Sequence, residues 1–188
     1  MKKIISFVIF MTLTNIICFA QYQIKKVYGV TLGDSQHNVI TILDSKGKQG
    51  TWTTLKSGKK RYKIHSVTLG ECTFDYASFI FSEGKLCSVI ISNEPNCGTM
   101  DTGMPAYSRF KSDVKRNENV FRVMAEALTE KYGSPTIQDD KMVMWKCNGN
   151  QITLVYCYEE SDFGIGWKNG ETWVDITYKI SDISSSNY

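Results

Sequence analysis

Histidine is scarce in this sequence of 188 residues, and C-x-x-C cysteine pairs are absent. The two histidines, His37 and His65, belong to no catalytic or metal-binding motif. General acid–base catalysis and metal binding usually need an imidazole close to carboxylates. Without a C-x-x-C pair, a zinc ribbon or a thioredoxin-type site has no support. The sequence therefore predicts no catalytic residue, no metal ligand and no cofactor.

A large excess of one charge is also lacking. The chain has 22 Lys and Arg against 19 Asp and Glu, a formal net charge of +3. Such a balance gives no support to a nucleic-acid partner. One local basic region could meet an anionic partner, such as lipopolysaccharide or an acidic protein surface, but it is more typical of a solvated hairpin face. This region contains Lys46, Lys48, Lys56, Lys59, Lys60, Arg61 and Lys63.

Residues 1–20 have the composition of a secretory signal peptide. Two lysines precede an apolar, uncharged stretch over residues 4–17, and residues 18–20 resemble a small-x-small cleavage site. The stretch is too short and too interrupted to span a membrane. Lipidation of Cys18 is disfavoured because a bulky isoleucine precedes it. We expect cleavage between Ala20 and Gln21, a secreted or periplasmic location, and no stable membrane insertion.

Five cysteines follow the predicted signal peptide, and an oxidising compartment favours disulfides between them. Extension of a predicted hairpin brings Cys72 near Cys97 on one face, about two residues out of register, so this pair is the candidate disulfide. Cys147 and Cys157 lie at opposite ends of a second hairpin, which is too far for a bond. A cysteine-dependent enzyme would need a partner histidine and an electropositive setting. The sequence leaves the connectivity open.

Two helices are predicted. The stronger signal runs from Asn117 to Pro135, where apolar residues recur at the helical spacing and Gly133 can end the helix. A shorter helix begins after Asp34 or Ser35, either of which can cap it. The apolar stripe of the longer helix consists of Phe121, Met124, Ala125, Leu128 and Tyr132.

Each predicted helix is followed by about four segments with the composition of strands. The turns at residues 83–84 and 148–149 predict two hairpins. Their register should place apolar side chains on a shared face. The expected cross-strand pairs are Phe81 with Leu86, Ile80 with Cys87, Trp145 with Ile152, and Val143 with Leu154.

The repeated order predicts an α+β fold of two layers, in which helices pack on antiparallel sheet. We interpret it as two tandem units of one helix and four strands. The first unit is expected over residues 21–95 and the second over 106–181. Glycine and proline predict a linker over 96–105, and the polar residues 182–188 predict a disordered tail.

Two motifs resemble those of known exported proteins: G-x-x-L-G-D-S-x-x-x-V and L-x-x-K-Y-G-x-P. With the repeated order, they resemble the tandem fold of the β-lactamase inhibitor protein and the single-unit outer-membrane assembly lipoprotein family of the SmpA/OmlA type. The resemblance implies this fold and a binding role, and identifies no partner. Neither the lipid anchor of the assembly family nor an inhibitory loop finds a match here. The residues that carry the resemblance are Gly29, Leu32, Gly33, Asp34, Ser35, Val39, Leu128, Lys131, Tyr132, Gly133 and Pro135.

Residues 159–171 predict a long loop between the last two strands, with three glycines and two aromatic residues. Aromatic anchors on a flexible loop are typical of a protein-binding surface. The loop also carries acidic residues, but their spacing is not that of a calcium-binding EF-hand loop. The candidate binding residues are Phe163, Trp167, Glu159, Glu160 and Asp162.

These observations predict an exported, non-catalytic binding protein of the cell envelope, of the inhibitor or assembly type, with another envelope protein as its partner. The alternative is a carrier of a small ligand or lipid held between the helices and the sheet. An enzyme that uses one of the cysteines is the least favoured interpretation.

Overall fold

The computed structural model describes residues 26–147 and 149–181, so the predicted signal peptide and C-terminal tail lie outside the described residues. The side chains of Asn96, Cys97, Cys147 and Phe163 also lie outside the description. Neither described helix combines the length and the apolar character needed to cross a bilayer. The elements are α2 (Gln36–Ser45), β1 (Gly50–Thr54), β2 (Lys60–Leu69), β3 (Cys72–Ser82), β4 (Lys85–Ser92), β5 (Asn96–Asp101), α3 (Pro105–Tyr132), β6 (Ile137–Gln138), β7 (Met142–Cys147), β8 (Asn150–Gly164) and β9 (Trp167–Ile180).

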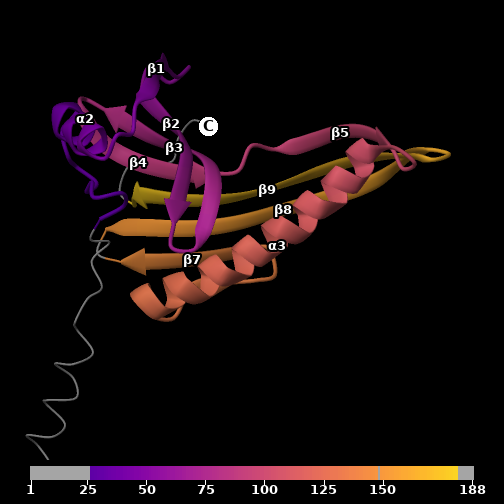
Figure 1. Cartoon of the computed structure of the whole chain (residues 1–188). Coiled ribbons are helices and arrows are strands. Elements are labelled where there is room, and N and C mark those ends of the chain that lie inside the picture. Colours follow the sequence, from indigo (N-terminus) through magenta and orange to yellow (C-terminus); the bar gives the residue numbers. More distant parts are fainter. Residues whose placement is uncertain (1–25, 148, 182–188) are drawn as a thin grey trace, which may run out of the picture.

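The nine described strands form one antiparallel sheet (Figure 1). Its order is β1-β2-β3-β4-β9-β8-β7-β6, and β5 pairs with the distal part of β9. Strands β4 and β9 meet in the middle, where residues 88–92 pair with residues 175–179. The predicted α+β fold, with helices on an antiparallel sheet, is therefore confirmed, and both halves of the chain contribute to a single sheet.

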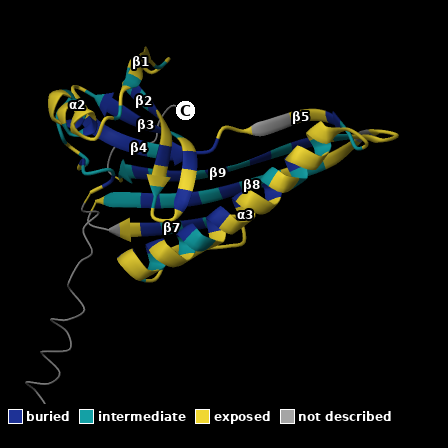
Figure 2. Ribbon diagram, in the orientation of Figure 1, coloured by how far each residue is buried: buried dark blue, intermediate teal, exposed yellow. Residues whose placement is uncertain are grey.

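Both helices cover the same face of the sheet. The apolar stripes of α2 and α3 join one core with the inward side chains of the strands, while the outer side of α3 is exposed (Figure 2). In β9 burial alternates strictly, with Val174, Ile176 and Tyr178 buried and their neighbours only partly covered. This period of two gives the sheet a helix-covered face and a helix-free face.

Helix α3 is longer than predicted, because it begins at Pro105, twelve residues before Asn117. Proline is well suited to the first helical position, where its missing N–H is not needed. The buried stripe continues through Phe110 and Val114, but the polar Asn117 at a buried position interrupts the apolar pattern. The predicted end is confirmed: Gly133 has φ 79° and its N–H bonds to the carbonyl of Thr129.

The predicted linker over residues 96–105 is wrong. Residues 96–101 form β5, which pairs with β9 from Asn96 opposite Thr172 to Asp101 opposite Trp167. Only residues 102–104 connect this strand to α3. Gly98 lies within the strand and Pro105 begins the helix. Composition alone does not distinguish these uses of glycine and proline from a linker.

Three of the four expected cross-strand pairs are confirmed. Phe81 lies opposite Leu86, and both pairs of the β7–β8 hairpin are formed as expected. Ile80, however, pairs with Ser88 instead of Cys87, because the register shifts between Ile80 and Phe81. Such a β-bulge inserts one extra residue, here Cys87, into one strand of a pair.

The predicted bridge between Cys72 and Cys97 is not formed in this structure. Cys72, Cys87 and Cys157 are free thiols, and the described residues contain no disulfide. The prediction required the chain to continue along β3 after β4. Instead it crosses to β9, where Cys97 pairs with Glu171.

Candidate functional site

Residues 159–171 form the distal end of the β8–β9 hairpin, so the predicted loop is wrong. The ladder continues to Gly164 opposite Trp167, with a register shift after Asp162, and the chain reverses at residues 165–166. Together with β5 and the first turns of α3, these strands extend away from the rest of the molecule (Figure 1). We call this part, residues 96–111 and 158–172, the arm.

Two of the three glycines that suggested a loop serve the turn, and the third serves packing. Gly164 and Gly166 have φ values of 129° and 78°, which side-chain-bearing residues rarely adopt. Gly170 instead lies within β9 and faces α3, where a Cβ would come within 2.5–3.0 Å of the Phe110 ring. The ring is fully buried in a second apolar cluster with Met100 and Val114. The arm therefore has its own small core.

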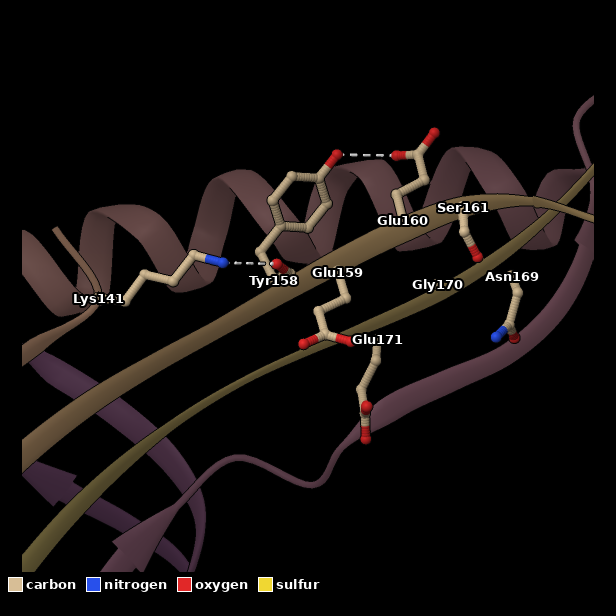
Figure 3. Close-up of a pocket in the computed structure, with 8 residues that line it drawn as sticks. All are labelled: Lys141, Tyr158, Glu159, Glu160, Ser161, Asn169, Gly170 and Glu171. Atoms are coloured by element: carbon tan, nitrogen blue, oxygen red, sulfur yellow. Dashed lines mark hydrogen bonds between the residues drawn. The ribbon is translucent and has the colours of Figure 1, made fainter.

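Glu160 joins β8 to the start of α3. Its carboxylate accepts hydrogen bonds from Tyr107 Oη at 2.9 Å and Lys111 Nζ at 2.9 Å. It also accepts one from Tyr158 Oη at 2.8 Å, which Figure 3 shows. The bonds from Lys111 and Tyr158 lower the pKa of Glu160 to about 2, and the bond to Glu160 raises the pKa of Lys111. Because both carboxylate oxygens are already bonded, Glu160 acts within the fold and is not free for a partner or a metal ion.

Because side chains alternate along β8, Glu159 lies on the opposite face of the strand from Glu160. Glu159 lies directly opposite Glu171, and together they line a depression of about 540 Å³ (Figure 3). Asp162 accepts a hydrogen bond from Lys168 at 2.5 Å. Within the described part of the chain, no group of three or more His, Cys, Asp or Glu side chains could hold a metal ion.

The tip of the arm is held together by the backbone and carries exposed apolar side chains. The carbonyl of Gly166 accepts hydrogen bonds from Thr102 N at 2.8 Å and Thr102 Oγ1 at 3.0 Å, so the hairpin turn is fixed to the connection between β5 and α3. Ile165 is fully exposed, and Met104 and Trp167 are 55% and 46% exposed. We call these three residues the tip patch.

The tip patch contains three of the five large apolar side chains that are exposed among the described residues. Of the predicted binding residues, Trp167 belongs to it, while the side chain of Phe163 lies outside the description. Met104 and Ile165 were missed. The position of Ile165 between two glycines was the available signal, since a turn exposes its central residue.

The arrangement of the histidines and cysteines does not favour nucleophilic catalysis. His37 and His65 are both exposed, in the first turn of α2 and in β2. Burial raises the pKa of the described thiols, Cys72, Cys87 and Cys157, above the usual value. A raised pKa disfavours the thiolate, which is the reactive form.

No family model matches this chain, and no similar protein was found among curated proteins or among solved structures. The chemistry and exposure of its own residues therefore carry the functional argument.

Proposed function

We propose that this protein is an exported, non-catalytic binding protein, whose arm inserts the tip patch into an apolar pocket of a partner protein. The observation that carries the proposal is the concentration of exposed apolar side chains at one end of the molecule. Exposed apolar groups that gather in one place are a feature of protein-binding surfaces. Tryptophan is also enriched among the residues that dominate binding energy.

The construction of the arm supports this role. The hydrogen bonds to Glu160 and the packing of Phe110 on Gly170 hold strands β8 and β9 of the arm to the first turns of α3 before any partner binds. A preformed binding element loses less conformational entropy on association. The ion pair between the exposed Asp162 and the half-buried Lys168 beside the patch would supply the polar rim that surrounds an apolar interface centre.

The non-catalytic part of the proposal is supported by the raised pKa values of the described thiols and the exposed histidines. Export is supported by the signal-peptide pattern of residues 1–20. The expected result is a mature protein that begins with Gln21 and is recovered outside the cytoplasm. Mass spectrometry of the protein from its producing cells would measure this directly, and an intact N-terminus would contradict export by cleavage.

The binding role can be tested with a photo-crosslinking amino acid at position 165 in the full-length chain. We expect one discrete adduct with a single protein partner. Trp52 is the control position, because it is 46% exposed like Trp167 of the tip patch but lies outside the arm, on β1. Crosslinking from position 52 should give no such adduct. In a competition assay, an excess of unlabelled Trp52→Ala protein should reduce the adduct formed at position 165. An equal excess of the Ile165→Ser/Trp167→Ala variant should leave that adduct unchanged.

Three results would overturn this assignment. Adducts of many masses at position 165 would indicate a sticky surface without a specific partner. Equal competition by both variants would show that the tip patch does not bind. A thermal melt lowered only in the Ile165→Ser/Trp167→Ala variant would show that these side chains support the fold.

We further propose that the two halves are copies of one unit, in line with the resemblance to the tandem binding fold. The support is topological. Each half has a helix followed by a four-strand meander, α2 with β1–β4 and α3 with β6–β9, and the last strands of the two halves pair antiparallel. Superposition of the first set on the second should align β3 with β8 and β4 with β9, and a failure to align them would contradict duplication.

A further inference from the structure

A cavity of about 370 Å³ lies on the helix-free face, over β3 and β4 and under the turn between β1 and β2. It is distinct from the arm, and it lies on the face opposite to the one where a ligand between helices and sheet was expected. Its volume falls within the range of small-molecule sites, roughly 300–1,000 Å³. At about 30 Å³ per water-sized group, it would hold roughly a dozen non-hydrogen atoms.

The floor of the cavity alternates apolar and hydroxyl side chains. Ser78 lies opposite Ile90, and Ile80 lies opposite Ser88, so the two serines and the two isoleucines are placed diagonally across β3 and β4. The β-bulge adds Cys87 to the same surface. This floor can contact an apolar body while it offers two donors.

Both serine hydroxyls lack a hydrogen-bond partner within the described residues, although Ser78 is only 2% and Ser88 only 6% exposed. Buried polar atoms are almost always bonded, and a buried hydroxyl left without a partner is destabilising. These two groups lie in the wall of a cavity. A ligand with polar atoms would therefore satisfy them.

The rim of the cavity is basic and unneutralised. Lys56, Lys59 and Arg61 line it, and none of them forms an ion pair with a carboxylate in the described part of the chain. Lys63, the neighbouring basic residue on the same face of β2, differs because Glu94 binds it at 3.4 Å. The unneutralised charges thus lie at the cavity, where they would attract an anion.

We propose that this cavity binds a small amphipathic organic anion, a carboxylic acid with an apolar body of about ten carbons. The carboxylate accepts hydrogen bonds from Lys59, Arg61 and the serine hydroxyls, and the apolar body lies on Ile80 and Ile90. Part of the basic region of residues 46–63 therefore has a specific role. The proposal does not depend on the tip patch, because the two sites share no residue.

Decanoate is a suitable probe, with decan-1-ol as the neutral match and acetate as the head group alone. Titration of the full chain, followed by amide NMR and calorimetry, should shift residues 78–80 and 87–90. Decanoate should bind at least tenfold more tightly than decan-1-ol, and acetate should not bind measurably. Equal affinity for decanoate and decan-1-ol, shifts confined to other residues, or an absence of decanoate binding would overturn the proposal.

A Ser78→Ala/Ser88→Ala variant separates a ligand role from a structural one. If the hydroxyls serve the ligand, their removal should leave the Tm unchanged or raise it, and should weaken decanoate binding about tenfold. A lowered Tm with unchanged decanoate affinity would show that the hydroxyls only support the fold and would contradict the proposal.

The charge requirement has its own matched control. Lys59→Gln and Arg61→Gln should each weaken decanoate binding about tenfold. Lys60→Gln makes the same charge change at the position between them, but Lys60 does not line the cavity. The affinity of the Lys60→Gln variant for decanoate should stay within twofold of the parent. An equal loss of affinity in all three variants would show that only the overall positive charge matters, and would overturn the assigned contacts.

Discussion

Gly170 in β9 faces the buried ring of Phe110 in α3 so closely that a Cβ at position 170 would lie 2.5 Å from Cζ of the ring. This contact sets the distance between α3 and strand β9 in the arm. The ring cannot move aside easily, because it is fully buried among its neighbours.

Gly170→Ala should therefore destabilise the protein by about 1–3 kcal/mol, the usual cost of overpacking a core. Chemical denaturation would measure this. Gly103→Ala is the control in the same arm, because its Cβ would meet only Asp101 Oδ1 at 3.4 Å, and its effect should stay within about 0.5 kcal/mol. Equal stability of the two variants would show that α3 is not held at this distance by Phe110.

The polar side chain of Asn117 should be required for the stability of the interface between α3 and the sheet. Its side chain accepts a hydrogen bond from Asn93 Nδ2 at 3.0 Å and donates one to Thr172 Oγ1 at 3.2 Å, and all three residues are buried. Asn117→Ala should cost about 1–3 kcal/mol, because it leaves buried partners unsatisfied. A double-mutant cycle with Thr172→Val should give a coupling of at least about 0.5 kcal/mol, and strict additivity would contradict the bond.

Glu160 should make the stability of the arm depend on pH at the acid end. Its pKa in the folded protein is lowered to about 2, mainly by the hydrogen bonds from Lys111 and Tyr158. Since the folded pKa is depressed, the contribution is complete above the unfolded value of about 4.3 and is lost as the pH falls towards 2.

Glu160→Gln should reduce stability at pH 7 by about 1–2 kcal/mol, a figure that allows for the partial exposure of Lys111. The variant should also lose less of its free energy of unfolding than the parent does between pH 4 and 2. Amide exchange in residues 105–111, compared at pH 7, would show where the loosening occurs. Glu159→Gln is the control, because it changes the adjacent position of β8, where the carboxylate makes no side-chain hydrogen bond within the described part of the chain. This variant should behave like the parent.

Asp175 should have the opposite pH dependence. It lies on the helix-free face between Ser92 and Val155, and burial raises its pKa. Because the folded pKa is raised, the cost of the charged form is absent below the unfolded value of about 3.9 and is complete above the folded value. Asp175→Asn should therefore raise the Tm at pH 7 by a few degrees and leave it unchanged near pH 3. A Tm lowered at pH 7 would show that the charge is stabilised by a partner.

Local patterns in the sequence were enough to predict the end of α3 and most of the hairpin register. Gly133 ends the helix in the expected conformation, and the hairpin predicted from the Asn-Gly pair in the sequence has Trp145 opposite Ile152. Both depend on residues close together in the chain. The first turns of α3 were hidden because the buried Asn117 bonds to Asn93, directly after β4, and to Thr172 of β9, and only the tertiary structure brings these residues to it.

The candidate sites were harder to predict, for related reasons. The aromatic residue Trp167 was identified as a candidate. Gly170 was misinterpreted as a loop glycine, because nothing in the neighbouring sequence indicates that Phe110 packs against it. Ser78 and Ser88 look like ordinary solvent-facing residues of two strands. The turn between β1 and β2 lies over them, and such long-range covering cannot be inferred from strand periodicity.

The pairing of β4 with β9 has a consequence for biogenesis. β9, which pairs with β4, is the last of the described strands to be synthesised and, on the export route proposed above, the last of them to leave the channel. A partly emerged chain therefore presents an open, apolar strand edge. Such intermediates are prone to intermolecular pairing until β9 arrives. We expect the yield of folded protein to depend on how long that edge is shielded, by slow release or by a chaperone, more than on the final stability.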